Sequence, residues 1–79
     1  MNFTKIRFFL SETAEVRLTV YDLSGKVVST LVEQEVLPGN REFVWHGRDR
    51  FGKKVSSGTY FFCLEVGSFS QTKSMVLLK

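Results

Sequence analysis

Residues 15–21 read Glu-Val-Arg-Leu-Thr-Val-Tyr, and this stretch decides the class of fold. Apolar and polar residues alternate along it with a period of two, which is typical of a β-strand that buries one face. The same alternation occurs earlier, over Thr4–Leu10, where Ile6, Phe8 and Leu10 share one face. No segment of the chain carries a sustained helical stripe of apolar residues, so the sequence predicts an all-β protein.

Further strands are predicted wherever such runs recur between turn residues. The connection Ser11–Ala14 is short and polar, so we expect the strands on either side of it to pair with each other. The remaining strands are expected at 27–32 (which 33–36 could extend), 41–46, 58–66 and 68–78. Together these runs predict an immunoglobulin-like antiparallel β-sandwich of about six to seven strands.

The aromatic residues indicate where the core lies. Phe43 and Trp45 are expected to point inward, and Trp45 is the predicted centre of the core and should be buried. The run Tyr60–Leu64 is apolar on both faces, which indicates either a strand covered on both sides or, more often, one whose outer aromatic residues are partly exposed.

Length and composition set the number of domains. The chain has 79 residues, 43% of them hydrophobic and eight of them Phe, with only seven Gly and Pro together. This is enough apolar surface for a packed globule and too little length for a second core. We therefore predict a single immunoglobulin-like domain over residues 1–79.

Two turns share the pattern Asp-x-x-Gly-Lys-x-Val-Ser, one starting at Asp22 and the other at Asp49. In such turns the Asp side chain accepts hydrogen bonds from the following backbone amides, while Gly25 or Gly52 takes a positive φ. These four residues are therefore assigned a structural role, and both turns are predicted to be hairpin connections. Each turn offers one carboxylate, so calcium binding is disfavoured.

The net charge of +3 is concentrated in one place. Arg48, Arg50, Lys53 and Lys54 face a single acid, Asp49, so their local surplus equals the charge of the whole chain. Such a loop could bind an anionic partner, or it could be a solvated hairpin tip. Nucleic acid is not the favoured partner.

Catalytic and metal-binding patterns are missing from the sequence. His46 is the only histidine, and a triad built from it, Asp49 and a serine would have neither a nucleophile elbow nor an oxyanion-hole signature. Cys63 is the only cysteine, so no internal disulfide or Cys-rich metal site can form. No apolar run approaches the roughly 20 residues of a membrane helix. We expect a non-catalytic protein with no catalytic residues, metal or cofactor.

The order of motifs resembles a known family over nearly the whole chain. The matching segments are Ile6–Leu10, Val16–Asp22, Gly25–Val28, Pro38–Gly39, Trp45–Gly47, Asp49, Gly52, Val55–Tyr60 and Lys73–Lys79. They resemble the C-terminal sorting domains of type IX secretion cargo, and also the immunoglobulin-like domain of the flagellar hook-capping protein. Two features depart from the family pattern. This chain has Trp45-His46-Gly47 where the family motif reads Trp-Asp-Gly, and it lacks the Asn-Pro pair that usually precedes the first strand.

The resemblance to sorting domains implies a C-terminal module that directs secretion or surface attachment of a larger bacterial protein. Its partner would then be the secretion machinery or an envelope component, with a neighbouring domain of the parent protein as another contact, and its location would be secreted or on the outer cell surface. The implied sorting segment consists of Lys73, Met75, Val76, Leu77, Leu78 and Lys79. A core strand would equally account for Met75–Leu78.

Two other functions fit the sequence. The first is a structural scaffold or adhesion module, like the hook-cap domain, that contacts its neighbours through a sheet edge. The second is a carbohydrate-binding accessory domain, for which Tyr21, Phe51, Phe61 and Phe69 are the candidate stacking residues. Packing is the alternative role for each of these four rings.

Overall fold

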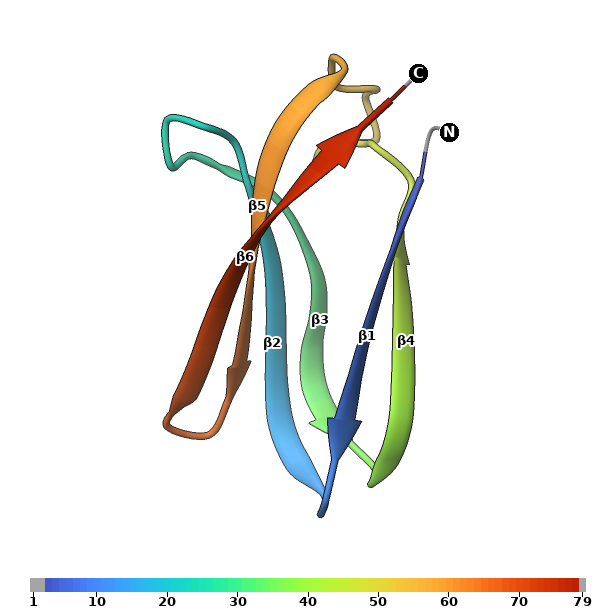
Figure 1. Ribbon diagram of the computed structural model, residues 1–79, viewed down its shortest axis with the longest axis vertical. Helices are drawn as coiled ribbons and strands as arrows, with labels where there is room; N and C mark the ends of the chain where they lie inside the picture. The colour runs from blue at the N-terminus through green and yellow to red at the C-terminus, as the bar shows by residue number, and fades with distance from the viewer. Residues whose placement is uncertain (1–2, 79) are drawn as a thin grey trace.

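Two antiparallel β-sheets of unequal width face each other in the computed structural model, which describes residues 3–78 (Figure 1). The strands are β1 (Thr4–Leu10), β2 (Ala14–Tyr21), β3 (Val27–Val36), β4 (Gly39–Trp45), β5 (Gly58–Val66) and β6 (Phe69–Leu77). One sheet has the strand order β3-β2-β5-β6 and the other consists of β1 and β4. The predicted antiparallel sandwich is therefore confirmed, with six strands among the described residues.

The first two strands do not pair with each other, and the expectation that they would was wrong. β1 pairs with β4, with Ile6 opposite Phe43, while β2 lies between β3 and β5 in the other sheet. The polar connection after Leu10 therefore crosses between the sheets. The reason is that β1 and β2 each have one apolar face: in opposite sheets the two faces cover each other, which a hairpin would not allow.

The core consists of two clusters stacked along the strands. One cluster contains Ile6, Leu10, Val16, Leu18, Val32, Val36 and Leu64. The other contains Val20, Val28, Trp45, Tyr60, Met75 and Leu77. Leu31 and Phe62 pack against both. Trp45 is 2% exposed and its ring meets that of Tyr60 edge-on at 5.0 Å, which confirms its predicted burial.

Strand boundaries differ from the prediction mainly around the turn between β3 and β4. β3 continues through Val36, the longer of the two predicted limits, whereas β4 starts before the predicted residue 41, at Gly39, where a φ of +118° favours glycine. On β5, Phe61 and Cys63 are half-buried, so the outer face of this strand is partly exposed, as expected.

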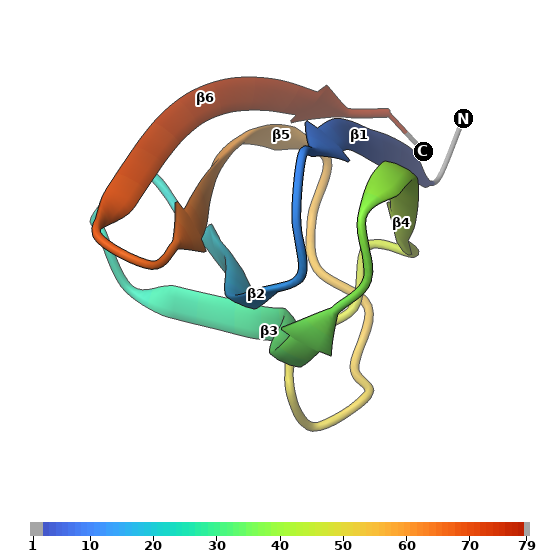
Figure 2. The same ribbon diagram turned by 90° about the horizontal axis from the view of Figure 1, so that it is seen from below.

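Two connections that contain the Asp turns lie at the same end of the sandwich. β2 leads into the Asp22 turn and β4 into the long loop of residues 46–57, and both connections lie at the end where β1 begins and β6 finishes (Figure 1). Viewed along the strands, the four-stranded sheet curves round the pair β1–β4 (Figure 2). The described residues contain no helix that could cross a membrane.

Candidate interaction surfaces

The two Asp turns have the same backbone geometry. The Oδ1 atom of Asp22 accepts hydrogen bonds from the amides of Ser24 and Lys26, at 2.9 and 3.0 Å. The Oδ1 atom of Asp49 accepts the equivalent bonds from Phe51 and Lys53, at 2.9 and 3.0 Å. Gly25 and Gly52 follow with φ values of +87° and +84°. The shared motif therefore forms one turn structure, used twice.

Only the first of these turns is a hairpin within a sheet. The Asp22 turn joins β2 to β3, which are neighbours. The Asp49 turn lies in the crossover from β4 to β5, which belong to different sheets, and it closes a single bridge between Arg48 and Lys54. Both turns therefore form the predicted hairpin connection locally, but the second does not join neighbouring strands of one sheet, because a repeated turn motif fixes local backbone shape and not the sheet in which the next strand lies.

Hydrogen bonds from the sandwich hold the second turn in place. The indole Nε1 of Trp45 donates to the carbonyl oxygen of Arg48 at 2.9 Å. The amide of Arg50 donates to the carbonyl oxygen of Val28 on β3 at 2.8 Å. The loop is thus fastened to both sheets near its base.

Residues 48–54, here called the basic loop, present cations around one aromatic ring. Phe51 is 76% exposed, and the guanidinium carbon of Arg50 lies 5.0 Å from the centre of its ring. Arg48 reaches across the turn and donates to the carbonyl oxygen of Gly52 at 2.9 Å. Lys53 and Lys54 are exposed. The four predicted anion-binding residues therefore lie in one loop, and Asp49, which accepts backbone hydrogen bonds, is their only acidic neighbour within it.

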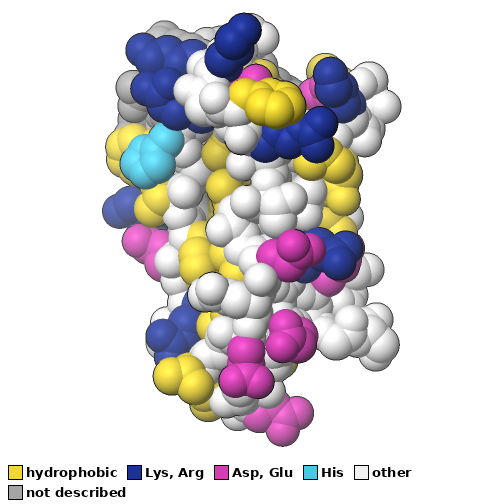
Figure 3. All heavy atoms as spheres, turned by 180° about the vertical axis from the view of Figure 1, so that it is seen from behind, with side chains coloured by type: hydrophobic (Ala, Val, Ile, Leu, Met, Phe, Trp, Pro, Cys, Tyr) yellow, Lys and Arg dark blue, Asp and Glu magenta, His cyan; other side chains and the backbone are white. Residues whose placement is uncertain are grey.

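Acidic residues gather at the opposite end of the sandwich. Arg17 forms ion pairs with Glu33 at 3.0 Å and Glu65 at 3.7 Å, while Glu15 lies directly opposite Glu35. Figure 3 shows Lys and Arg concentrated towards one end of the molecule and Asp and Glu towards the other. The charge is thus asymmetric along the strands, and it favours an acidic partner at the basic loop.

The proposed sorting segment is split between core and surface. Met75 is 9% exposed and Leu77 is fully buried, so both belong to the core. Lys73 is exposed, as are Val76 at 60% and Leu78 at 61%. Lys79 lies outside the described residues. Contact with a secretion receptor would therefore involve the exposed members while the domain stays folded.

The four aromatic candidates for sugar stacking do not form one platform. Tyr21 and Phe61 are opposite each other on β2 and β5, beside a shallow depression of about 350 Å³. Phe51 lies in the basic loop, and Phe69 begins β6 at the far end of the sandwich. The structure therefore brings two of the four rings together.

The residues considered for catalysis are not assembled. The carboxylate of Asp49 is engaged with the amides of its own turn, and His46 is exposed with its ring 6.3 Å from that of Phe3. Asp49 thus serves the turn and not the imidazole. Across residues 3–78, no group of three or more His, Cys, Asp or Glu side chains could hold a metal ion.

A groove beside β1 was missed by the sequence analysis. It has a volume of about 470 Å³ and is bounded by β1 on one side and by the β5–β6 hairpin on the other. Its apolar lining includes Phe8, Phe9, Leu10, Leu64, Val66 and Phe69. The wrong pairing of β1 with β2 concealed it, although Phe9 at an outward strand position was a signal that could have found it.

Comparison with known proteins identifies a matching family and several solved structures of similar fold. The model of the FlgD Ig-like domain family matches residues 3–68. The crystal structure of FlgD from P. aeruginosa matches with a TM-score of 0.72 and 27% sequence identity, over 94% of this chain and 58% of that one. The chain thus spans little more than half the length of that FlgD. No curated protein gives a significant match.

Proposed function

The chain belongs to the FlgD Ig-like domain family, and from this premise we propose that it is a structural module of hook-cap type, which acts through contacts with other proteins and not through catalysis. The observation that carries the proposal is the family match over residues 3–68, together with a similar fold in a FlgD structure. Folds of this kind host many functions, so the contact surfaces must supply the specificity.

We propose the basic loop as one such contact surface, with an acidic surface of a neighbouring subunit as its partner. Three features support this role: Phe51 is an exposed aromatic anchor, the surrounding cations are exposed, and the base of the loop is hydrogen-bonded to both sheets. A rigid aromatic residue beside Arg is a common combination in the energetically important part of an interface. Residues 1–79 would then act as one immunoglobulin-like domain of a larger exported protein, outside the cell.

Affinity capture with the intact chain tests the proposal. The immobilised chain is exposed to envelope extract of the source organism, and bound proteins are identified by mass spectrometry. Flagellar hook or rod proteins are expected, with binding that weakens at high salt because exposed charges are screened. A variant with Arg50, Lys53 and Lys54 changed to Gln is the matched control for the loop. Recovery of secretion-machinery components in place of flagellar proteins would contradict the proposal.

A second candidate function is a signal for secretion or surface attachment read from β6. The exposed apolar side chains of Val76, on this edge strand, and of Leu78, just beyond its end, favour it. Removing residues 67–79 would be a poor test, because Met75 and Leu77 belong to the core. A reporter fused to the chain should instead be exported from a type IX-competent cell, and the double change Val76→Ser and Leu78→Ser should stop export while the domain remains folded. Unchanged export of that variant would refute the recognition of β6.

A further inference from the structure

β1 has a free edge. Within the described residues it pairs only with β4, so the backbone groups along its other side have no strand partner. An exposed edge of this kind is a template for an added strand unless charges or prolines protect it. The edge strands of the larger sheet have such protection: β3 carries Glu33 and Glu35, and β6 is polar from Ser70 to Ser74.

The second half of β1 lacks this protection. Phe8, Phe9 and Leu10 follow one another there, and Phe9 is 67% exposed. These residues form one wall of the groove described above, and Phe69, which is 58% exposed, lies on the opposite wall. The groove volume of about 470 Å³ falls within the roughly 300–1,000 Å³ of typical binding sites.

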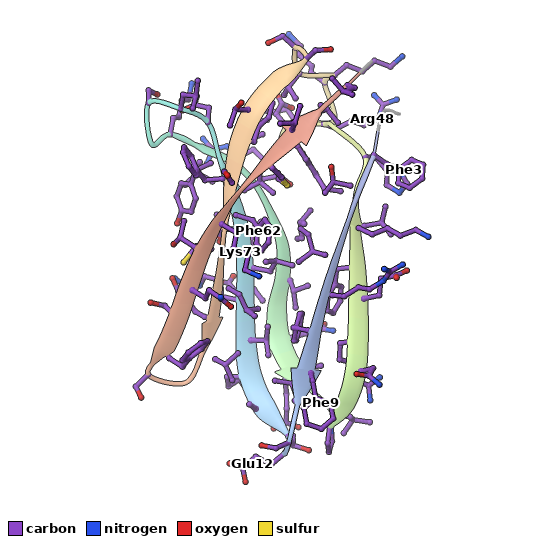
Figure 4. The ribbon with its side chains drawn as sticks, in the orientation of Figure 1. Phe3, Phe9, Glu12, Arg48, Phe62 and Lys73 are labelled. Carbon is purple, nitrogen blue, oxygen red and sulfur yellow. The ribbon has the colours of Figure 1, made fainter. Side chains whose placement is uncertain are left out.

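The charged groups at the groove favour a cationic occupant. Arg7 and Glu12 are the charged residues that line it. Arg7 is already paired with Glu42, whose carboxylate lies 2.6 Å from the guanidinium Nε. Glu12 lies just beyond the end of β1, at the same end of the molecule as Phe9 and remote from Arg48 (Figure 4). The acidic end of the sandwich therefore adds its field to that of Glu12.

We propose that the free edge of β1 and this groove form a site for one added β-strand. The occupant is an extended segment of a different polypeptide, apolar at alternate positions, with a Lys or Arg beside Glu12. Backbone hydrogen bonds to β1 would provide the affinity, and the apolar groove would select the alternate side chains. The inference rests on the proposed function, because it names the edge through which the module holds a neighbouring protein.

A second copy of the chain is a poorer occupant in the pairings that oppose its own cations. β1 presents Lys5 and Arg7 on its outward face, so two β1 strands that pair in parallel and in register, or antiparallel around residues 5–7, bring these cations together across the new ladder. Like charges on paired strands are destabilising. A segment with its own single cation at the acidic end avoids this conflict.

The first experiment uses a defined probe with the intact chain. The probe is a peptide of about nine residues, alternating Val and Thr with one Lys at an end, within the usual length of a strand. Amide chemical shifts of the chain are followed during titration. We expect changes along residues 7–12 and 69–71, and several-fold weaker binding of a control peptide with Glu in place of Lys. Absence of binding, or shifts confined to β3, would overturn the proposal.

Two matched variants sharpen the test. Phe69→Lys puts a cation on the groove wall, and Leu23→Lys makes the same change at a residue that is 69% exposed in the Asp22 turn. Both positions are exposed, so both variants should fold. We expect Phe69→Lys to weaken peptide binding by about tenfold or more, the equivalent of losing one buried aromatic contact, and Leu23→Lys to leave it unchanged. Equal binding by the two variants would refute the site.

The failures of the two proposals can be told apart. If the chain captures the flagellar proteins but the peptide does not bind at β1, the structural module stands and the β1 site is wrong. If the chain captures no flagellar protein but binds the peptide at β1, the strand site stands and the proposed function is wrong. Concentration-dependent dimers that Phe69→Lys abolishes would assign the groove to a second copy and overturn the occupant proposed here.

Discussion

The Asp22 and Asp49 turns are built alike and used differently. In each turn the Asp side chain accepts hydrogen bonds from the backbone amides two and four residues later, and a glycine has a positive φ. The first turn joins two strands of one sheet, and its third hydrogen bond comes from the Ser24 hydroxyl at 2.7 Å. The second turn lies in the connection between the two sheets, and it has Phe51 where the first turn has Ser24.

This difference separates what the motif determines from what it leaves free. The Asp and Gly positions fix the backbone in both turns, so the two residues between them can vary without loss of the turn. In the Asp22 turn these residues are Leu23 and Ser24, with Lys26 as the adjacent cation. In the Asp49 turn they are Arg50 and Phe51, and the surrounding cations make this turn the candidate contact surface.

The largest loss of stability is expected when Trp45, which anchors only the second turn, is replaced. Trp45→Ala should lower the free energy of unfolding by about 3–5 kcal/mol, because it leaves a cavity in the core and removes the donor to the Arg48 carbonyl. Trp45→Phe keeps most of the packing and should cost less. Hydrogen exchange in this second variant should rise in residues 48–54 and not in residues 22–26. Equal loosening of both turns would show that Trp45 is no specific anchor.

The glycines should give a smaller effect that is equal in the two turns. A Cβ atom at Gly25 or Gly52 would meet no other atom within 4 Å, so the cost of alanine comes from the positive φ alone. Each of Gly25→Ala and Gly52→Ala should therefore lower stability by about 1–2 kcal/mol in urea unfolding. The corresponding Asn variants should cost less, because Asn tolerates this conformation. A clear difference between the two Ala variants would contradict the equivalence of the turns.

The acid response of the first turn should depend on the Ser24 hydroxyl. Hydrogen bonds from the Ser24 hydroxyl, followed by the Lys26 amide, lower the pKa of Asp22. Because the folded pKa lies below the unfolded one, the stabilisation is present above about pH 4 and is lost as the pH falls through the folded pKa. Ser24→Ala should raise the pKa of Asp22 towards its ordinary value, as measured by NMR titration of the carboxyl group. An unchanged pKa in Ser24→Ala would show that the hydroxyl is not the main cause.

The same carboxylate provides a test of stability. In Asp22→Asn, the decline in the urea midpoint below about pH 4 should become shallower, since one acid-sensitive group has been removed. Glu42, whose pKa is lowered by its hydrogen bond from Arg7, remains and should account for part of the residual decline. If the urea midpoint of Asp22→Asn declined below about pH 4 as steeply as that of the unchanged chain, Asp22 would have no role in the loss of stability in acid.

The strands and turns could be predicted from sequence because their signals are local. The alternation in residues 15–21 and the Asp-x-x-Gly pattern each act through neighbouring residues, and the structure has β2 and both turns where they were expected. Pairing is not local. β1 and β4 are far apart in sequence, and their contact depends on which apolar faces must cover each other, so the partner of β1 was predicted wrongly.

The two candidate surfaces also differ in whether their residues are neighbours in the sequence. The basic loop is contiguous in sequence, so its charge could be counted directly from residues 48–54. The groove joins Phe9 on β1 to Phe69 on β6, and it exists only because these strands lie in different sheets. No pattern within either strand contains that information, since each aromatic residue alone is an ordinary exposed ring.

The smallest effect on stability is expected at the tip of the second turn, where the effect on binding should be greatest. Phe51→Ser makes the tip resemble that of the first turn, and it should change unfolding by no more than about 0.5 kcal/mol because the ring is 76% exposed. Binding of a poly-glutamate probe should nevertheless weaken, since Arg50 loses the ring that orients it. Adding Ser24→Phe to the Phe51→Ser variant moves the ring to the first turn, away from the four cations, and should not restore binding. If this double variant bound the probe as tightly as the unchanged chain does, an exposed ring on either turn would be sufficient, and the charge around Phe51 would not be what distinguishes the two turns.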